Sequence, residues 1–287
     1  MNTTRKVRII VDSTTDVTED VRRRLTVVPL TICFGDEEYV DGITIDRQRF
    51  YEKLIETDSI PTTSQPTPAL FASVYDEVIA ADEDAVVLTI DHKLSGTYQS
   101  AVIAAEDYPN RIYVVDGRSV TIGTGILAEL ALELAQAGAD APTIVEALDT
   151  AREQVRVIAM LDTLEYLKKG GRISTATAVA GGLLSIKPVI SLTGGEIRIL
   201  GKARGSRQAN NLLVQQIENT GGVDFTKPLL LGYTGLSDTL LQKYVEDSAP
   251  LWEGHTDTLR STLVGSTVGT HAGPGAVAVA FFAKENK

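Results

Sequence analysis

The apolar run Ala85–Ile90 is the sequence feature that most constrains how this chain can fold. A run without polar alternation is typical of a parallel strand that is buried on both faces. Ser95–Thr97 follows it, and apolar residues then recur at helical spacing as far as Ala105, so Ser95 or Thr97 can cap a helix. Free backbone N–H groups at such a helix start can bind an anion. An ordinary capped helix explains the same residues equally well.

Strands and helices alternate in the same way through the first half of the chain. The other expected strands are Val7–Val11, Val27–Ile32 and Arg111–Val115, and further helices are expected after Asp46, over 68–81 and over 119–137. This order predicts a parallel sheet that is covered by helices on both faces. Ligands bind such sheets beyond the carboxyl ends of the strands, where the loops that carry Asp12, Thr63 and Ser95 should meet.

A segment rich in hydroxyl groups lies between two prolines ahead of the helix over 68–81. Pro61 and Pro66 break regular structure, so Thr62 and Thr63 are expected on a loop. Thr67 is expected to cap the helix that follows, with a proline at its first position.

The pattern changes at Gly138–Pro142, and a further helix to about Gln154 is expected to lead into a second domain. Expected strands there are Val155–Leu161, Pro188–Leu192, Glu196–Leu200, Leu229–Tyr233, Thr258–Val264 and Ala276–Phe282. Thr193–Gly195 is a hairpin signal, and Asp162 is expected to cap a short helix. We therefore predict an α/β fold with two domains, a parallel-sheet domain over 1–154 and a smaller domain with a mixed sheet over 155–287.

Charge and cysteine content limit the partners and the compartment. The 287 residues include 27 basic and 38 acidic side chains, a formal charge of −11, which disfavours nucleic acid or an anionic membrane as the main partner. The single cysteine, Cys33, excludes an internal disulfide and fits a reducing cytoplasm. The sequence contains no secretory leader and no apolar run of about eighteen residues, so a soluble cytoplasmic protein without integral membrane association is expected.

Two segments resemble nucleotide-binding loops without meeting their requirements. Gly123–Ala128 matches a dinucleotide fingerprint in letters but lies inside a helical pattern rather than at the end of a strand. Gly195–Ala203 has one residue too many for a Walker loop and lacks the hydroxyl that holds magnesium. The three histidines, His92, His255 and His271, have no carboxylate or histidine at ligand spacing, so no metal site or cofactor is predicted.

Three further features leave two interpretations open. Small residues fill Ser174–Leu184, which either packs closely against another backbone or leaves room for a long thin ligand. His271 lies among glycines, where its imidazole either donates to an oxyanion or is a structural side chain. Ser95 and His271 can also form a hydrolase pair, although Ser95 lacks the nucleophile elbow Gly-x-Ser-x-Gly.

Six motifs, in this order along nearly the whole chain, resemble the DegV family of bacterial proteins. They are Asp12-Ser13-Thr14, Thr62-Thr63-Ser64-Gln65-Pro66, Leu94-Ser95-Gly96-Thr97, Gly170-Gly171-Arg172-Ile173, Lys187-Pro188 and His271-Ala272-Gly273-Pro274-Gly275. The resemblance implies a DegV-like fold that binds one long-chain fatty acid between its two domains. It also implies a carrier without enzymatic activity, which presents the carboxylate to a separate ATP-dependent fatty acid kinase. The acyl phosphate formed would serve phospholipid synthesis.

The resemblance also implies which residues hold the carboxylate. Thr63, Ser95 and His271 match the family's carboxylate-binding residues, with His271 in the closing glycine loop, and Gly96 belongs to the same turn as Ser95. Secondary candidates for the same site are Thr62, Thr97 and Arg172.

A basic residue after the hairpin is associated in the family with the kinase or the phosphate. Arg204 is the nearest match, although Arg207 could take that role, because the sequence here is less uniformly basic than the family pattern. We expect a monomer, because a carrier must leave one face free for its kinase, and the esterase or thioesterase that uses Ser95 and His271 remains the alternative.

Overall fold

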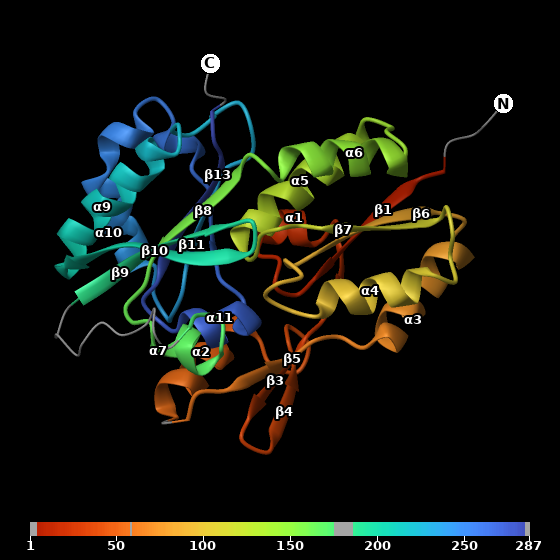
Figure 1. Cartoon of the computed structure of the whole chain (residues 1–287), viewed down its shortest axis with the longest axis horizontal. Helices are drawn as coiled ribbons and strands as arrows, with labels where there is room; N and C mark the ends of the chain where they lie inside the picture. The colour runs from red at the N-terminus through yellow and green to blue at the C-terminus, as the bar shows by residue number, and fades with distance from the viewer. Residues whose placement is uncertain (1–4, 58, 175–185, 285–287) are drawn as a thin grey trace.

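The computed structural model describes residues 5–57, 59–174 and 186–284 and arranges them in three sheets with their covering helices (Figure 1). The first sheet has four parallel strands in the order β2-β1-β6-β7. Its elements are β1 (Val7–Asp12), β2 (Thr26–Val28), β6 (Asp84–Thr89) and β7 (Ile112–Asp116). The parallel sheet predicted for the first half of the chain is thereby confirmed.

Helices cover both faces of this sheet. One face carries α3 (Pro68–Ala80) and α4 (Thr97–Ala105), and the other carries α5 (Ile122–Gln136) and α6 (Ala141–Ala151) (Figure 1). Along β6, Val87 packs with the first pair of helices, while Val86 and Leu88 pack with the second. The run Ala85–Ile90 is apolar apart from Thr89 because both faces of its strand are buried.

The second sheet has six strands in the order β10-β9-β8-β13-β11-β12 and is mixed, as predicted. Its elements are β8 (Val155–Met160), β9 (Ile186–Thr193), β10 (Glu196–Arg204), β11 (Leu230–Tyr233), β12 (Ser261–Leu263) and β13 (Val277–Phe282). α9 (Gly205–Asn219) and α10 (Thr239–Asp247) cover its outer face. Glu196 pairs with Thr193, so the predicted hairpin is confirmed.

α5 joins the two sheets, because it contacts β1 of the first sheet and β8, β11 and β13 of the second. Apolar residues of both sheets therefore belong to one continuous core, from Val7 on β1 to Phe282 on β13. The division into domains at residue 154 remains a prediction. Among the described residues, no helix is long and apolar enough to cross a membrane.

A third, small sheet corrects two of the expectations. It pairs β3 (Thr31–Phe34) with β4 (Glu37–Val40) and with β5 (Thr62–Ser64), all antiparallel. The expectation of a loop at Thr62 and Thr63 was wrong. The segment between the two prolines forms the strand β5 because it pairs with β3. The single strand expected over Val27–Ile32 was also wrong: it is split at Pro29, which has no N–H group for a ladder, into strands of two different sheets.

The short helices also differ from expectation at two points. His271 lies on helix α11 (Ser266–Ala272) rather than in a glycine loop. Gly269 serves close packing there, since an added Cβ would lie 2.6 Å from the Tyr51 hydroxyl of α2 (Arg47–Glu56). Asp162 does not cap α7 (Glu165–Lys169), which begins after Leu164; it pairs instead with Lys187 at 2.6 Å. The one remaining α-helix with a label in Figure 1 is α1 (Glu19–Arg22).

Several local signals were interpreted correctly. Asp46 caps α2 by accepting from Arg49 N at 2.8 Å, and Thr67 caps α3 by accepting from Leu70 N at 3.3 Å. Gly123–Ala128 lies inside α5, where an added Cβ on Gly125 would lie 2.1 Å from the Asp16 carbonyl oxygen. Close helix packing, rather than phosphate binding, therefore accounts for this glycine.

Candidate functional site

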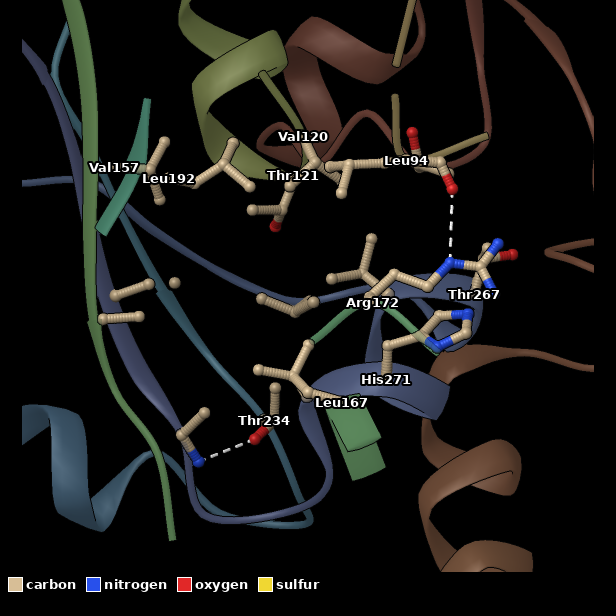
Figure 2. Close-up of a pocket in the computed structure, with 18 of the residues that line it drawn as sticks. Leu94, Val120, Thr121, Val157, Leu167, Arg172, Leu192, Thr234, Thr267 and His271 are labelled. Carbon is tan, nitrogen blue, oxygen red and sulfur yellow. Dashed lines mark hydrogen bonds between the residues drawn. The ribbon is translucent and has the colours of Figure 1, made fainter. Parts of the chain in front are cut away.

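A cavity with an empty volume of about 920 Å³, its opening included, lies between the two larger sheets. Figure 2 shows Val157 and Leu192 at one end of the view and Arg172 and His271 at the other. Residues from the ends of β1 and β6, from the start of α5 and from the inner face of the second sheet line the cavity. It therefore lies where the carboxyl ends of the parallel strands face a second layer of the fold.

Most of the cavity wall is apolar. Val157 and Leu192 come from β8 and β9, and Val120 comes from the segment before α5. Ala278 on β13 pairs with Ala159 on β8, and both small side chains line the cavity. The space exists because these neighbouring strands carry alanine on the face that is turned away from α9 and α10.

One end of the cavity is polar and brings together four residues singled out from the sequence. Thr63 from β5, Ser95 from the turn before α4, Arg172 from the segment after α7 and His271 from α11 all line it. The segments after β1 and β6 thus meet as the topology predicted, while Thr63 joins them from strand β5 of the small sheet rather than from a loop. A buried bond supports this meeting, because Asp12 Oδ2 at the end of β1 accepts from the backbone N–H of Ile90 at 2.7 Å.

His271 is held in this polar end by Thr63. Its Nε2 lies 3.0 Å from the Thr63 hydroxyl oxygen, and its buried Nδ1 has no hydrogen-bond partner among the described residues. Burial, together with the positive charge of Arg172, lowers the pKa of His271 to about 4. The imidazole is therefore neutral at pH 7, with one N–H group to donate. Gly170 lies against the ring, since an added Cβ would be 2.1 Å from Nδ1.

Arg172 supplies a positive charge that no described acid neutralises. Its Nε donates to the carbonyl oxygen of Leu94 at 3.2 Å, the bond drawn in Figure 2, and Nη1 donates to Gly170 O at 2.6 Å. Within the described residues no carboxylate forms an ion pair with it, and the sequence over 175–185 contains no acid. The guanidinium is half-buried, and this burial lowers its pKa.

The turn that carries Ser95 is fixed by local bonds. Ser95 Oγ lies 2.9 Å from the Thr97 hydroxyl and accepts from Thr97 N at 3.3 Å. Gly96 occupies the cap position of α4, where an added Cβ would lie 2.2 Å from the Gln65 side chain. Among the described residues, neither Ser95 nor a carboxylate is hydrogen-bonded to His271. The described residues therefore do not form a serine–histidine–acid relay.

Asp41 and Thr267 position the polar end and were not identified from the sequence. Thr267, which also lines the cavity, donates from its hydroxyl to Asp41 Oδ2 at 2.7 Å, and Ser13 donates to the same oxygen at 2.9 Å. This buried carboxylate thereby ties α11, which carries His271, to the loop after β1. No sequence spacing indicates it, because its partners are 28 and 226 positions away.

The other candidate residues lie outside the cavity lining. Thr62 is exposed on β5, and Thr97 is fully buried beneath Ser95. Arg204 ends β10 and Arg207 lies in the first turn of α9; both are exposed, at the opposite end of the hairpin from Leu192. The small-residue segment Ser174–Leu184, one possible wall for a long thin ligand, lies outside the described residues apart from Ser174.

These features define an α/β protein with a mostly apolar cavity between its two larger sheets and, at one end, an arginine that no described acid neutralises. The chain belongs to the DegV family, whose model, described as "Uncharacterised protein, DegV family", matches residues 6–284. A DegV domain-containing protein of Caldanaerobacter subterraneus is 34% identical over 281 residues, which cover 96% of this chain and 98% of that protein. A DegV domain-containing protein of Deinococcus radiodurans is 35% identical over 280 residues, covering 96% and 97%.

Solved structures share the fold over almost the full length. A DegV family protein from Thermus thermophilus, described by its fatty acid binding, has a TM-score of 0.85 at 31% identity and covers 96% of this chain and 99% of its own. A DegV lipid-binding protein from Thermotoga maritima has a TM-score of 0.85 at 29% identity, covering 98% and 100%. The DegV-like fold predicted from the sequence is thereby confirmed.

Proposed function

We propose that this chain binds one long-chain fatty acid, with its carboxylate at Arg172, His271, Thr63 and Ser95 and its tail along the apolar cavity. The observation that carries the proposal is the guanidinium of Arg172, which no described acid neutralises, at the polar end of a mostly apolar cavity. A bound carboxylate would neutralise the charge of Arg172, and hydroxyl and imidazole N–H groups would donate to the remaining lone pairs of the carboxylate oxygens. The fatty acid binding described for the Thermus thermophilus relative supports this reading.

The two ends of the ligand would contribute differently to binding. Burying about fourteen methylenes at about 0.8 kcal/mol each gives roughly 11 kcal/mol of gross driving force. A hydrogen bond to a charged group adds only about 1.5 to 3 kcal/mol. The tail therefore dominates the affinity, while the polar end fixes the orientation and distinguishes an acid from an alcohol or ester of the same length.

We further propose that the chain is a carrier without enzymatic activity of its own. It would present the carboxylate to a separate ATP-dependent fatty acid kinase, and the acyl phosphate would pass toward phospholipid synthesis. This part rests on the family motifs and on the lack of a Ser95–His271 bond among the described residues. The cytoplasmic setting and the monomeric state expected from the sequence stay predictions.

Arg204 and Arg207 are proposed as contacts for the kinase or for the phosphate that it transfers. Both lie at the amino-terminal end of α9, where the helix dipole disfavours positive side chains. Helix stability therefore does not account for them. Among the described residues neither forms an ion pair within 4.0 Å, although Arg207 interacts with the Asp247 carboxylate at longer range, and both guanidinium groups are exposed to an anionic partner.

Organic extraction of freshly purified protein, followed by mass spectrometry, tests the binding proposal. We expect about one fatty acid per chain and no turnover of acyl esters. Empty protein that hydrolyses esters, with turnover abolished by Ser95→Ala, would establish the esterase instead. Transfer of γ-phosphate from ATP in the presence of a fatty acid kinase tests the carrier role separately.

A further inference from the structure

A second cluster of polar side chains lies outside the cavity lining, beyond the carboxyl ends of β6 and β7. One potential ligand atom from each of Asp91, His92 and Asp116 lies within 4.8 Å of the others. His92 Nδ1 is 2.6 Å from Asp116 Oδ2 and 3.9 Å from Asp91 Oδ1. Asp116 is 24 positions from His92, so only the pairing of β6 with β7 brings it close.

Backbone N–H groups hold one oxygen of each carboxylate. In Asp116 the other oxygen, Oδ2, faces His92 Nδ1, whereas in Asp91 the held Oδ1 is the oxygen 3.9 Å from that nitrogen. Asp91 Oδ1 accepts from Lys93 N at 2.7 Å. Asp116 Oδ1 accepts from the N–H groups of His92, at 3.3 Å, and of Arg118, at 3.2 Å. Metal-binding carboxylates are typically fixed in this way by hydrogen bonds to their second oxygen.

The second oxygen of Asp91 is the unexplained group. Asp91 Oδ2 has no hydrogen-bond partner among the described residues, although the side chain is only 1% exposed. A buried carboxylate oxygen without a partner is costly unless a cation compensates it. Lys93 compensates it only at a distance, because its ammonium donates to Gly194 O at 3.0 Å and forms no ion pair with a described acid.

The hairpin between β9 and β10 covers Asp91 from the second sheet. Gly195 has a φ of +72°, and an added Cβ would lie 2.2 Å from Asp91 Oδ1, so only glycine permits this approach. His92, by contrast, is half exposed. The cluster is therefore closed on the Asp91 side and open to solvent on the His92 side.

We propose that Asp91, His92 and Asp116 form a binding site for a divalent transition-metal ion, with Zn²⁺ as the probe of choice. One imidazole nitrogen and two carboxylate oxygens are ligands that Zn²⁺ accepts, and the open side leaves a position for water. The site does not depend on what fills the cavity. It does share a turn with it, because the N–H groups of Leu94 and Ser95 both donate to the Asp91 carbonyl oxygen, at 3.0 and 3.2 Å.

Isothermal titration of Zn²⁺ into untagged protein, first dialysed against EDTA and then against metal-free buffer, tests the proposal. His92→Gln removes the half-exposed imidazole ligand together with its contact to Asp116. Asp91→Asn keeps the shape of the buried side chain and removes its charge. His255→Gln is the matched control, because it removes a histidine that stacks on Phe225, away from the cluster. Thermal unfolding establishes that each variant is folded.

We expect one Zn²⁺ per chain in the wild type and in His255→Gln, and a dissociation constant raised at least about tenfold in His92→Gln. Asp91→Asn should weaken binding similarly; if it does not fold, the exposed His92→Gln decides alone. Absence of one-to-one binding in the wild type would overturn the proposal. So would wild-type affinity in His92→Gln, or loss of binding in His255→Gln.

Discussion

Replacing Arg172 with glutamine tests whether the guanidinium binds the ligand carboxylate or only braces the fold. Arg172 bonds two backbone carbonyls, those of Leu94 and Gly170, and it also faces the cavity. Glutamine keeps one amide that can donate to a carbonyl, and it removes the charge. The variant therefore separates electrostatic binding from bracing.

The expected magnitude follows from the lost charge. A hydrogen bond to a charged group contributes about 1.5 to 3 kcal/mol, and every 1.4 kcal/mol is a factor of about ten in affinity. Arg172→Gln should thus weaken binding of a long-chain fatty acid by roughly 10- to 150-fold. Binding of the fatty alcohol of equal length should change little, because the alcohol carries no charge for Arg172 to neutralise.

Displacement of a fluorescent fatty acid from delipidated protein measures both affinities. Arg156→Gln is the matched control, since Arg156 also donates to two backbone carbonyls, those of Glu153 and Val155, but does not line the cavity. It should alter neither affinity. If Arg172→Gln weakened the acid and the alcohol equally, Arg172 would act only as a brace, and the carboxylate site would have to be placed elsewhere.

The remaining predictions concern the other polar groups, the tail and the kinase. The double variant Ser95→Ala with His271→Ala should keep the fold and retain less fatty acid, as measured by lipid extraction, because each lost donor costs about 1 to 3 kcal/mol of binding free energy. Unchanged fatty acid occupancy together with unchanged phosphorylation would remove both residues from the site. Ala278→Leu fills part of the cavity and should shift the extracted lipids to shorter chains, so an unchanged chain-length profile would place the tail elsewhere. In lipid-free protein the pKa of His271 is lowered to about 4, below its ordinary 6.5. Between these two values the unfolded chain binds a proton that the folded chain does not. The free energy of unfolding should therefore be fully retained above pH 6.5 and should fall toward pH 4, and it should fall less in His271→Ala. Denaturant midpoints that stay equal across this pH window would contradict the prediction. Arg204→Ala should retain lipid at wild-type stoichiometry and lose acyl-phosphate formation, whereas a defect confined to Arg207→Ala would move the role to that residue.

Local signals predicted the elements whose stability is local. The capping positions of Asp46 and Thr67 are correct because a side-chain cap depends only on the next three residues. The expectation for Thr62–Ser64 failed because β5 exists only through pairing with β3, some thirty positions earlier. α11 was missed for a related reason: its glycine serves contact with α2 rather than a loop. Tertiary partners, which no local pattern contains, decided both cases.

The candidate site divides along the same line. The position of the Ser95 turn beyond the carboxyl end of β6 follows from sheet topology, so it could be expected before any coordinates, whereas Thr63 reaches the site on β5 through its pairing with β3. The role of Arg172 as the charge that would bind the carboxylate could not be expected in this way. It depends on the absence of a nearby described acid, which is a property of the folded surroundings. Alternation of alanine and valine from Ala276 to Ala280 on β13 was a usable signal for the cavity wall. A strand with small residues on one face leaves space on that face.

The neutral state of His271 follows from the same electrostatics that would bind the ligand. Without ligand, a protonated His271 would place a second positive charge beside Arg172 in a partly desolvated site, and burial together with that repulsion keeps the pKa near 4. A bound carboxylate would offset the charge of Arg172 and leave a cluster with no net charge, which lowers the cost of desolvating it. The pKa of His271 should then rise on binding, because its protonated form would face an anion as well as a cation. In a chain of net charge −11, long-range attraction cannot bring a carboxylate to the protein, so recognition has to come from this short-range neutralisation.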